Sequence, residues 1–292
     1  MNQLDTLSTA LEAAVQNHTN HIRHLGNKSI AWRSAVQWDG ALWASFAQEA
    51  SPGETVPLAN GGQAGSAVVK AFDAVSGLVL LEVADSASGG IAALADSTAG
   101  VGAIALTIAN PSPDGVEAAL GVVRVRPPAG RYFQTDSSNF PGFAGALVVD
   151  SQGRFAGLVA REGRGNQGWI LPAARVRERL QALQTHGDLH VPRVGVVLEA
   201  IELEKSVTAD NSRQSGLLVR EVAKGSAAEL AGLHQGDIVV AVAGQAVEST
   251  GAFIEELGAL AIGSAVSIDR LRGGVRETLK LQPDYRLGAA KA

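Results

Sequence analysis

The sequence contains no cysteine. This absence excludes disulfide frameworks, thiolate zinc sites, iron–sulfur clusters and a cysteine nucleophile. An excess of basic residues is also lacking, because 24 Lys and Arg stand against 29 Asp and Glu for a formal net charge of −5. Nucleic acids and anionic membranes favour clustered Lys and Arg. We therefore expect neither as a partner.

Long apolar runs are missing as well. No segment reaches the roughly 18 uninterrupted apolar residues that a membrane-spanning helix needs. The first twenty residues have no basic n-region and no unbroken apolar h-region, so they do not read as a signal peptide. On these grounds we expect a cytoplasmic location.

What the sequence does have is enough apolar residues for two cores, since 46% of its 292 residues are hydrophobic. The amino-terminal part predicts an amphipathic helix within residues 1–24, beginning near Asp5, with Thr9 and Glu12 as a capping box. This helix either packs on its own domain or contacts another subunit. Its apolar positions recur at helical spacing and are Leu4, Leu7, Leu11 and Val15.

The pattern then changes to short apolar runs broken by Gly, Pro, Asn and Asp, from about residue 29 to residue 168. Such runs predict the strands of a barrel or sandwich. A helix is predicted over 172–184, and residues 186–192 have the turn chemistry of a linker. The last hundred residues mix strands with helices predicted at 226–231 and 250–260, which indicates a small α+β module.

Two segments carry a resemblance to a known family. Residues 132–146 read YFQTDSSNFPGFAGA, which is similar to the F-I-Q-T-D-A-A-I-N-P-G-N-S-G-G stretch of HtrA/Deg-like, trypsin-like serine proteases. Residues 225–233 and 236–239, GSAAELAGL and GDIV, resemble the core of a PDZ domain. The resemblance implies a mainly β fold: a chymotrypsin-like double β-barrel over 25–185, a PDZ domain over 193–285 and a tail over 286–292. It also implies trimeric assembly.

The same resemblance points to missing chemistry. Peptide hydrolysis by this fold needs a serine hydroxyl, a histidine base and an aspartate that orients the histidine. The aligned histidine position holds Ala47, or Phe46 if the alignment slips by one residue. The aspartate position holds Gly77, and the nucleophile position holds Ala144. None of these side chains can transfer a proton, so we predict a pseudoprotease with a degenerate triad.

The neighbours of these positions offer no obvious replacement. Gly142 is retained where the family donates a backbone N–H to the oxyanion. Phe143 replaces an asparagine, and we expect its ring to fill the substrate cleft. Ser45 and Glu82 lie near two lost positions, but adjacent strand residues point to opposite faces.

The PDZ resemblance implies a peptide-binding site. Such domains add a peptide as a strand beside their own edge and hold its carboxylate with backbone N–H groups of a glycine-containing loop. Here that loop is Arg193, Val194, Gly195 and Val196. The opposite wall is predicted to be the helix 250–260, where Ile254 and Leu257 line the groove or belong to the core.

His18, His21 and His24 form an H-x-x-H-x-x-H pattern that could ligate a metal through neutral imidazoles. No carboxylate accompanies them, so we expect solvated histidines at the end of the first helix. We therefore expect no metal and no cofactor.

Together these features predict a catalytically inactive HtrA-like protein that binds peptides or proteins, or acts as a scaffold, through its PDZ domain. Its partners would be C-termini or extended segments and an active HtrA-like paralogue, in a homo- or hetero-trimer. Two alternatives stay open: a divergent serine endopeptidase with relocated catalytic residues, and a structural subunit of a larger complex.

Overall fold

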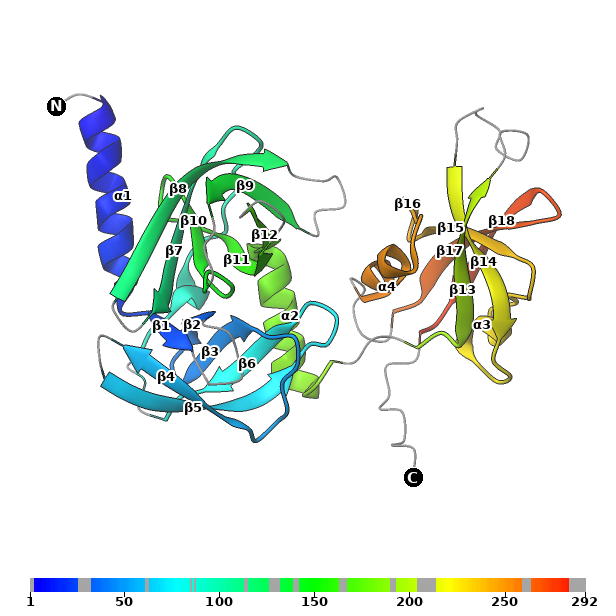
Figure 1. Ribbon diagram of the computed structural model, residues 1–292, viewed down its shortest axis with the longest axis horizontal. Coiled ribbons are helices and arrows are strands. Elements are labelled where there is room, and N and C mark those ends of the chain that lie inside the picture. The colour runs from blue at the N-terminus through cyan, green and yellow to red at the C-terminus, as the bar shows by residue number, and fades with distance from the viewer. Residues whose placement is uncertain are drawn as a thin grey trace. The chain divides into compact units, whose positions relative to one another are not determined.

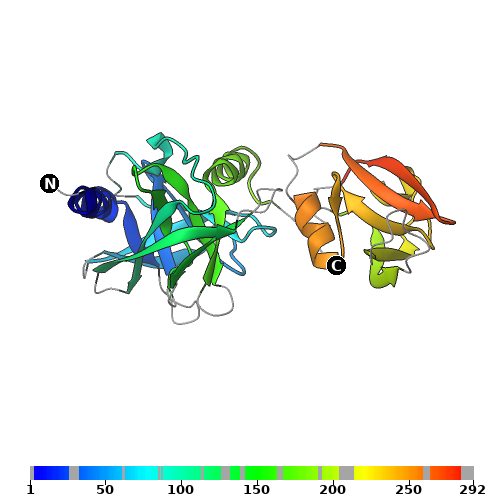
Figure 2. The same ribbon diagram turned by 90° about the horizontal axis from the view of Figure 1, so that it is seen from above.

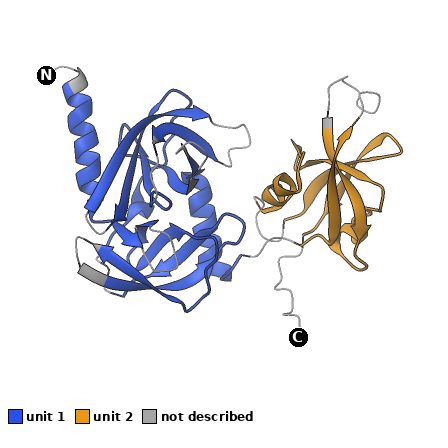
Figure 3. Ribbon diagram, in the orientation of Figure 1, with its two compact units in different colours: residues 1–189 blue, residues 190–292 orange. Residues whose placement is uncertain are grey.

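The computed structural model describes residues 3–25, 33–60, 63–84, 86, 88–112, 115–125, 132–138, 142–162, 167–189, 193–203, 214–258 and 264–283. The chain divides into two compact units, residues 1–189 and residues 190–292 (Figure 3). Both are built mainly from strands (Figure 1), which confirms the predicted mainly β fold class.

The first closed barrel of unit 1 has the strand order β1-β2-β3-β6-β5-β4 and closes where β1 pairs with β4. Alternating apolar residues form its interior, with Trp43, Leu58 and Leu81 almost fully buried. Its strands are β1 (Ile22–Leu25), β2 (Arg33–Asp39), β3 (Leu42–Phe46), β4 (Thr55–Asn60), β5 (Gln63–Phe72) and β6 (Leu78–Glu82).

The second closed barrel has the order β10-β11-β12-β9-β8-β7 and closes where β10 pairs with β7. Strand β7 also packs against β1 and β2 of the first barrel, so a seam runs between the two barrels. The predicted double β-barrel is therefore confirmed. Its strands are β7 (Ile104–Ser112), β8 (Gly115–Val125), β9 (Phe133–Ser138), β10 (Leu147–Asp150), β11 (Phe155–Glu162) and β12 (Gln167–Pro172), and the short helix η1 (Ile91–Ala93) precedes them.

Two helices pack at separate places on the outside of unit 1 (Figure 2). Helix α1 (Gln3–Thr19) begins before Asp5, and Thr9 donates its hydroxyl to the Asp5 carbonyl one turn earlier, so Thr9 is not a helix cap. Because β1 already starts at Ile22, the helix does not extend to residue 24. Helix α2 (Ala173–His186) lies close to the predicted range. No helix in the described part of the chain is long and apolar enough to cross a membrane.

Unit 2 is a small α+β module built on one sheet of order β13-β14-β15-β17-β18, with β16 beside β15. Strand β13 therefore lies at an edge of this sheet, paired with β14. The elements are β13 (Val196–Leu203), β14 (Gln214–Val222), α3 (Ala227–Leu230), β15 (Ile238–Val242), β16 (Gln245–Ala246), α4 (Thr250–Gly258), β17 (Val266–Arg272) and β18 (Val275–Leu281).

A buried carboxylate joins the elements of unit 2. Asp237, just before β15, is 1% exposed and forms ion pairs with Arg270 at 2.7 Å and Arg272 at 2.7 Å, both on β17. The two arginines also donate to the Gly232 carbonyl, which follows α3. The Asp237 carboxylate also accepts from the His234 backbone N–H at 2.9 Å, so its oxygens are well satisfied, whereas the buried Nε of Arg270 has no hydrogen-bond partner among the described residues.

The end of unit 1 overlaps the predicted linker. His186 ends α2, and the backbone N–H of Leu189 donates to the Phe72 carbonyl of the first barrel at 2.9 Å. Residues 190–192 lie outside the described residues. The boundaries of the linker at 186–192, and of the domains on either side of it, stay predictions.

Candidate functional site

The loop that would carry the nucleophile is well formed but has no hydroxyl. Ala144 is 9% exposed, and its carbonyl accepts a hydrogen bond from the Ser34 backbone N–H of β2 at 2.9 Å. The following Gly145 has φ +85°, and a Cβ there would lie 1.9 Å from the Ser34 carbonyl oxygen. Only glycine therefore allows the two backbones to approach so closely.

Neutral hydrogen bonds fix this loop at the seam between the barrels. The buried Ser34 hydroxyl accepts from the Asn110 backbone N–H of β7 at 2.9 Å and donates to the Gly142 carbonyl at 3.1 Å. The Ser45 hydroxyl of β3 donates to the Ser34 carbonyl at 2.8 Å. The seam therefore holds the loop through backbone groups, whatever side chain stands at position 144.

The histidine and aspartate positions touch each other through the backbone. The Ala47 N–H donates to the Gly77 carbonyl at 2.8 Å. Gly77 has φ +79°, and a Cβ on it would lie 2.8 Å from the Ala47 carbonyl oxygen. In this backbone conformation the turn therefore leaves no room for a side chain at position 77.

Gly142 and Phe143 are adjacent in the loop but lie in different surroundings. Gly142 has φ +99° with Pro111 closely packed against it, since a Cβ there would lie 2.8 Å from the Pro111 Cβ. Phe143 is 1% exposed and belongs to the apolar cluster inside the second barrel, together with Phe133 and Ile170. The expectation that Phe143 fills a substrate cleft is wrong, because its apolar ring packs in the core of the second barrel.

The side chains near the lost positions are poorly placed for nucleophilic chemistry. Ser45 is 0% exposed, and its hydroxyl is committed to the Ser34 carbonyl. Glu82 is about half exposed and pairs with Lys70 at 3.1 Å. An activated nucleophile needs a positioned base and access to substrate.

The histidine pattern does not make a metal site. Among the described residues, no group of three or more His, Cys, Asp or Glu side chains is placed to hold a metal ion. His18 and His24 are 7% and 3% exposed. The expectation of solvated histidines is therefore wrong for these two, because the helix end and β1 turn their rings inward.

In unit 2, the predicted peptide-binding loop is anchored by its carbonyls. Val194 accepts from the Ala228 N–H of α3 at 2.9 Å, and Gly195 accepts from the Ala223 N–H at 2.8 Å. Gly195 has φ +76°, and a Cβ on it would lie 2.3 Å from the Ser226 Cβ. Glycine is therefore required for the loop to pack against the start of α3.

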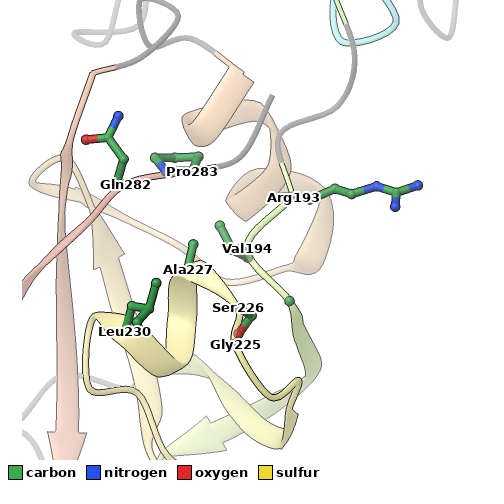
Figure 4. Close-up of a pocket in the computed structure, with 9 residues that line it drawn as sticks. Arg193, Val194, Gly225, Ser226, Ala227, Leu230, Gln282 and Pro283 are labelled. Carbon is green, nitrogen blue, oxygen red and sulfur yellow. The ribbon is translucent and has the colours of Figure 1, made fainter. Parts of the chain in front are cut away.

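A pocket of about 370 Å³ opens beside this loop (Figure 4). Val194, Ala227 and Leu230 give it an apolar part, and Leu230 is 83% exposed. The Arg193 side chain is exposed and points away from the other labelled side chains (Figure 4). The remaining lining residues are Gly195, Gly225, Ser226, Gln282 and Pro283.

The pocket is lined partly by the loop that was predicted to bind peptide and partly by other elements, and its role in peptide binding stays a prediction. Arg193, Val194 and Gly195 were predicted, whereas the start of α3 and the end of β18 were not. One available signal was Ser226 in the GSAAEL motif. It caps α3 by accepting from the Glu229 N–H, and the cap fixes that helix against the loop.

The other predicted residues lie along the edge strand and α4. Val196 begins β13 and is partly buried. On α4, Ile254 is half-buried, whereas Leu257 is 1% exposed in the same cluster as Val194. Val196, Ile254 and Leu257 do not line the pocket of Figure 4, and their role in a groove between β13 and α4 stays a prediction.

Unit 2 is similar to a known domain family. Residues 192–282 match the model of the PDZ domain family. Over 148 residues the chain is 30% identical to the "Probable periplasmic serine endoprotease DegP-like" of Chlamydia trachomatis, covering 49% of this chain and 30% of that protein. It is 27% identical over 203 residues to the periplasmic serine endoprotease DegP of Salmonella typhimurium, covering 65% of this chain and 42% of that protein.

Solved structures extend the likeness to both units. The HtrA-type protease AlgW with tripeptide matches with a TM-score of 0.69 at 21% identity, over 95% of this chain and 98% of that one. AlgW with decapeptide matches with a TM-score of 0.68 at 18% identity, over 95% and 99%. The chain is HtrA/DegP-like. It has the trypsin-like fold of these serine proteases followed by a PDZ domain.

The relatives also correct the predicted location. The expectation of a cytoplasmic location is wrong, because it is contradicted by the DegP and DegP-like relatives, which are named as periplasmic enzymes. The composition of the first twenty residues did not determine the compartment. The HtrA-like chain spans less than half the length of these curated relatives, 30% and 42% of the two described.

Proposed function

We propose that this HtrA-like protein captures extended peptide segments or C-termini through its PDZ domain without cleaving them. The observation that carries the proposal is a contrast within the chain. The positions aligned with the catalytic triad hold Ala47, Gly77 and Ala144, while the loop at 193–196 has a glycine, Gly195, with φ +76°. PDZ domains hold a peptide carboxylate with backbone N–H groups of a glycine-containing loop.

The absence of catalysis follows from three separated changes. Ala144 has no hydroxyl to attack a carbonyl, and Ala47 has no imidazole to accept a proton. A Cβ on Gly77 would lie 2.8 Å from the Ala47 carbonyl oxygen, so the turn does not have space for an orienting carboxylate. Loss of nucleophile or base removes about six orders of magnitude in rate in serine proteases of this mechanism.

The divergent-protease alternative finds little support in the buried hydroxyls. Ser34 and Ser45 are both 0% exposed, and both hydroxyls are hydrogen-bonded at the barrel seam. A hydroxyl at that depth cannot meet a substrate carbonyl without separating β2 from β7. We therefore retain the pseudoprotease as the proposal.

Peptide capture is supported by two features of unit 2. Strand β13 is an edge strand, so a peptide can be added beside it as a further strand. The loop at Val194 and Gly195 lies directly before that strand, and the pocket of about 370 Å³ adjoins it. The likeness to AlgW with tripeptide and with decapeptide agrees with this use of the domain.

We further propose a periplasmic location and a trimer, formed with copies of the same chain or with an active HtrA-like paralogue. The names of the relatives support the location, and the barrel fold shared with HtrA-type proteases supports assembly. Light scattering of the full chain, compared with a chain lacking residues 1–19, measures the mass and the part that α1 plays. A monomeric full chain would overturn the homotrimer.

Two assays on the full chain test the capture proposal. In the first, a fluorophosphonate probe and fluorescent casein are added, with an active trypsin-like protease as positive control; we expect neither labelling nor hydrolysis. In the second, a library of C-terminal peptides is passed over the immobilised protein, and we expect retention of a subset. Labelling of any serine would overturn the pseudoprotease, whereas silence across the library would favour a purely structural subunit.

A further inference from the structure

The loop of unit 2 that would bind peptide is held by a hydrogen bond from one short helix. The Ala228 backbone N–H of α3 donates to the Val194 carbonyl at 2.9 Å. In a trans peptide group the C=O and the N–H point in opposite directions. This hydrogen bond therefore turns the N–H of Gly195 away from α3. Because PDZ domains hold a peptide carboxylate with N–H groups of this loop, the position of Ala228 matters for capture.

Helix α3 is too short to hold itself in place. It has four residues, Ala227–Leu230, and Ser226 caps its start by accepting from the Glu229 N–H. Isolated helices of this length are not stable in water, so contacts with the rest of unit 2 must fix its position. Two of these contacts are apolar, since Ala228 and Leu233 are 0% and 1% exposed in the core of unit 2.

The chain just after α3 is also held by two guanidinium groups of β17. The Gly232 carbonyl accepts from Arg272 Nη2 at 3.0 Å and from Arg270 Nη1 at 3.3 Å. The adjacent Leu233 N–H donates to the Ala228 carbonyl at 2.9 Å. Hydrogen bonds thus lead in series from β17, through residues 232 and 233 and through α3, to the binding loop.

A buried carboxylate fixes these guanidinium groups. Asp237 is 1% exposed and lies 2.7 Å from Arg270 Nη1 and 2.7 Å from Arg272 Nε. Arg272 Nη2 also donates to Asp237 at 2.9 Å, so one planar group contacts both Asp237 and the Gly232 carbonyl. A planar fork with several contacts has less freedom than the point charge of a lysine. Arg272 is therefore a fixed support for Gly232.

We propose that Arg272 is a positioning residue for peptide capture, because it holds Gly232, and with it α3, where Ala228 orients the binding loop. This inference rests on the proposed function of unit 2. Arg272 is 40% exposed, so its side chain can be changed without opening the core. Its loss leaves Asp237 paired with Arg270, so the buried carboxylate keeps a partner and unit 2 stays folded.

Amide hydrogen exchange on the full chain tests the positioning. The substitution Arg272→Met keeps an apolar stem and removes the guanidinium. We expect the protection of the Ala228 amide, which donates to the loop, to fall about tenfold. The amide of Ile268 is the internal control, because it lies in β17 between β15 and β18, and its protection should persist. Equal losses at the two amides would mean overall destabilisation of unit 2 and would overturn the proposal.

The affinity for peptide is a readout that a purely structural role would not change while the chain stays folded. A fluorescent copy of one peptide retained from the C-terminal library is titrated with the full chain, and circular dichroism checks that each variant is folded. We expect Arg272→Met to weaken binding about fivefold or more. Arg276→Met removes a 58% exposed guanidinium that pairs with Asp269, and as the matched control it should bind like the parent chain. Parent-like affinity of Arg272→Met would contradict the proposal.

A second variant, Arg272→Lys, keeps a positive charge beside Asp237 but loses the planar fork. We expect the Ala228 protection and the affinity to fall in the same direction as in Arg272→Met. If the parent chain retains no peptide, the proposed function fails, and the role in capture fails with it. If the parent chain binds peptide and both Arg272 variants bind equally well, only the positioning role is overturned.

Discussion

The two units hold their functional loops in the same way but depend on different atoms for function. In unit 1 the loop at Gly142–Gly145 is fixed by Ser34, and in unit 2 the loop at Val194–Gly195 is fixed by α3; both use backbone hydrogen bonds and a left-handed glycine. Proteolysis needs side chains on its loop, whereas capture of a peptide needs backbone groups. Under the proposed function, the residues at positions 47, 77 and 144 affect the first of these requirements and not the second.

The substituted positions of unit 1 and the loop glycine of unit 2 differ in what surrounds them. The described hydrogen bond that holds Ala144 at the seam uses its backbone carbonyl, so it does not depend on the side chain at this position. At Gly77 a Cβ would lie 2.8 Å from the Ala47 carbonyl oxygen, and the Phe143 ring lies in the core of the second barrel. At Gly195 a side chain would collide with Ser226.

The largest effect is expected from the buried ion pairs of unit 2. Asp237→Asn leaves Arg270, 6% exposed, without its main partner, and we expect a loss of about 3–5 kcal/mol in the free energy of unfolding of unit 2. Urea unfolding followed by circular dichroism measures it. Glu277→Gln, which removes the half-exposed partner of the same arginine, is the control and should cost less than about 1 kcal/mol. Equal costs would show that burial does not govern this network.

The substitution Gly195→Ala tests whether this loop binds peptide, and a second glycine variant controls for the effect on folding. The left-handed backbone costs alanine roughly 1–2 kcal/mol, and the overlap with the Ser226 Cβ at 2.3 Å adds to this by displacing the loop. Gly244→Ala is matched, since it has φ +78° and nothing within 4 Å of the new Cβ. We expect Gly195→Ala to abolish peptide retention and Gly244→Ala to preserve it. If both variants retain peptide equally, the loop is not the binding element.

Variants that restore side chains of the catalytic triad test whether unit 1 still has room for them. Gly77→Asp forces a side chain to 2.8 Å from the Ala47 carbonyl at φ +79°, and we expect a cost of about 1–3 kcal/mol. Ala144→Ser adds a hydroxyl to an accommodating loop and should cost less, below about 2 kcal/mol. Thermal unfolding of both variants measures this order. A fully stable Gly77→Asp variant that labels with fluorophosphonate once Ala144→Ser and Ala47→His are added would contradict a reshaped site.

The smallest effect concerns pH and a surface carboxylate of unit 2. Burial would raise the pKa of Asp269, but hydrogen bonds from Thr278 and Arg276, and the charge of Arg276, outweigh it and lower that pKa below 3.8. Its stabilising contribution is thus present above about pH 3.8 and is lost as the pH falls through the folded-state pKa. We expect Asp269→Asn to cost less than about 1 kcal/mol at neutral pH and nothing at low pH. A cost that does not depend on pH would show that the charge plays no part.

The fold could be predicted largely from the sequence because its signals are local and collinear. Short apolar runs separated by turn residues gave the strands, and the GSAAEL and GDIV motifs gave the PDZ domain. The end of α1 was misplaced, because the helical spacing of Leu4 to Val15 does not show where β1 begins. Boundaries depend on pairing partners that are distant in sequence.

The candidate site was less accessible to sequence reasoning. Arg193–Gly195 could be found from a motif, but the remaining wall of the pocket comes from α3 and the end of β18, which only the folded sheet brings together. The burial of His18 and His24 likewise follows from packing between distant parts of unit 1, and that of Phe143 from packing inside the second barrel. Polar residues in a sequence show neither which side of a seam they face nor what they contact.

The most direct test of capture without cleavage is a single chromatographic measurement on the full chain. A library of C-terminal peptides is passed over the immobilised protein, and the retained and unretained fractions are analysed by mass spectrometry for both binding and cleavage. The account predicts that a subset of peptides is retained and recovered intact. Cleavage products in either fraction, or no retention of any peptide, would contradict it.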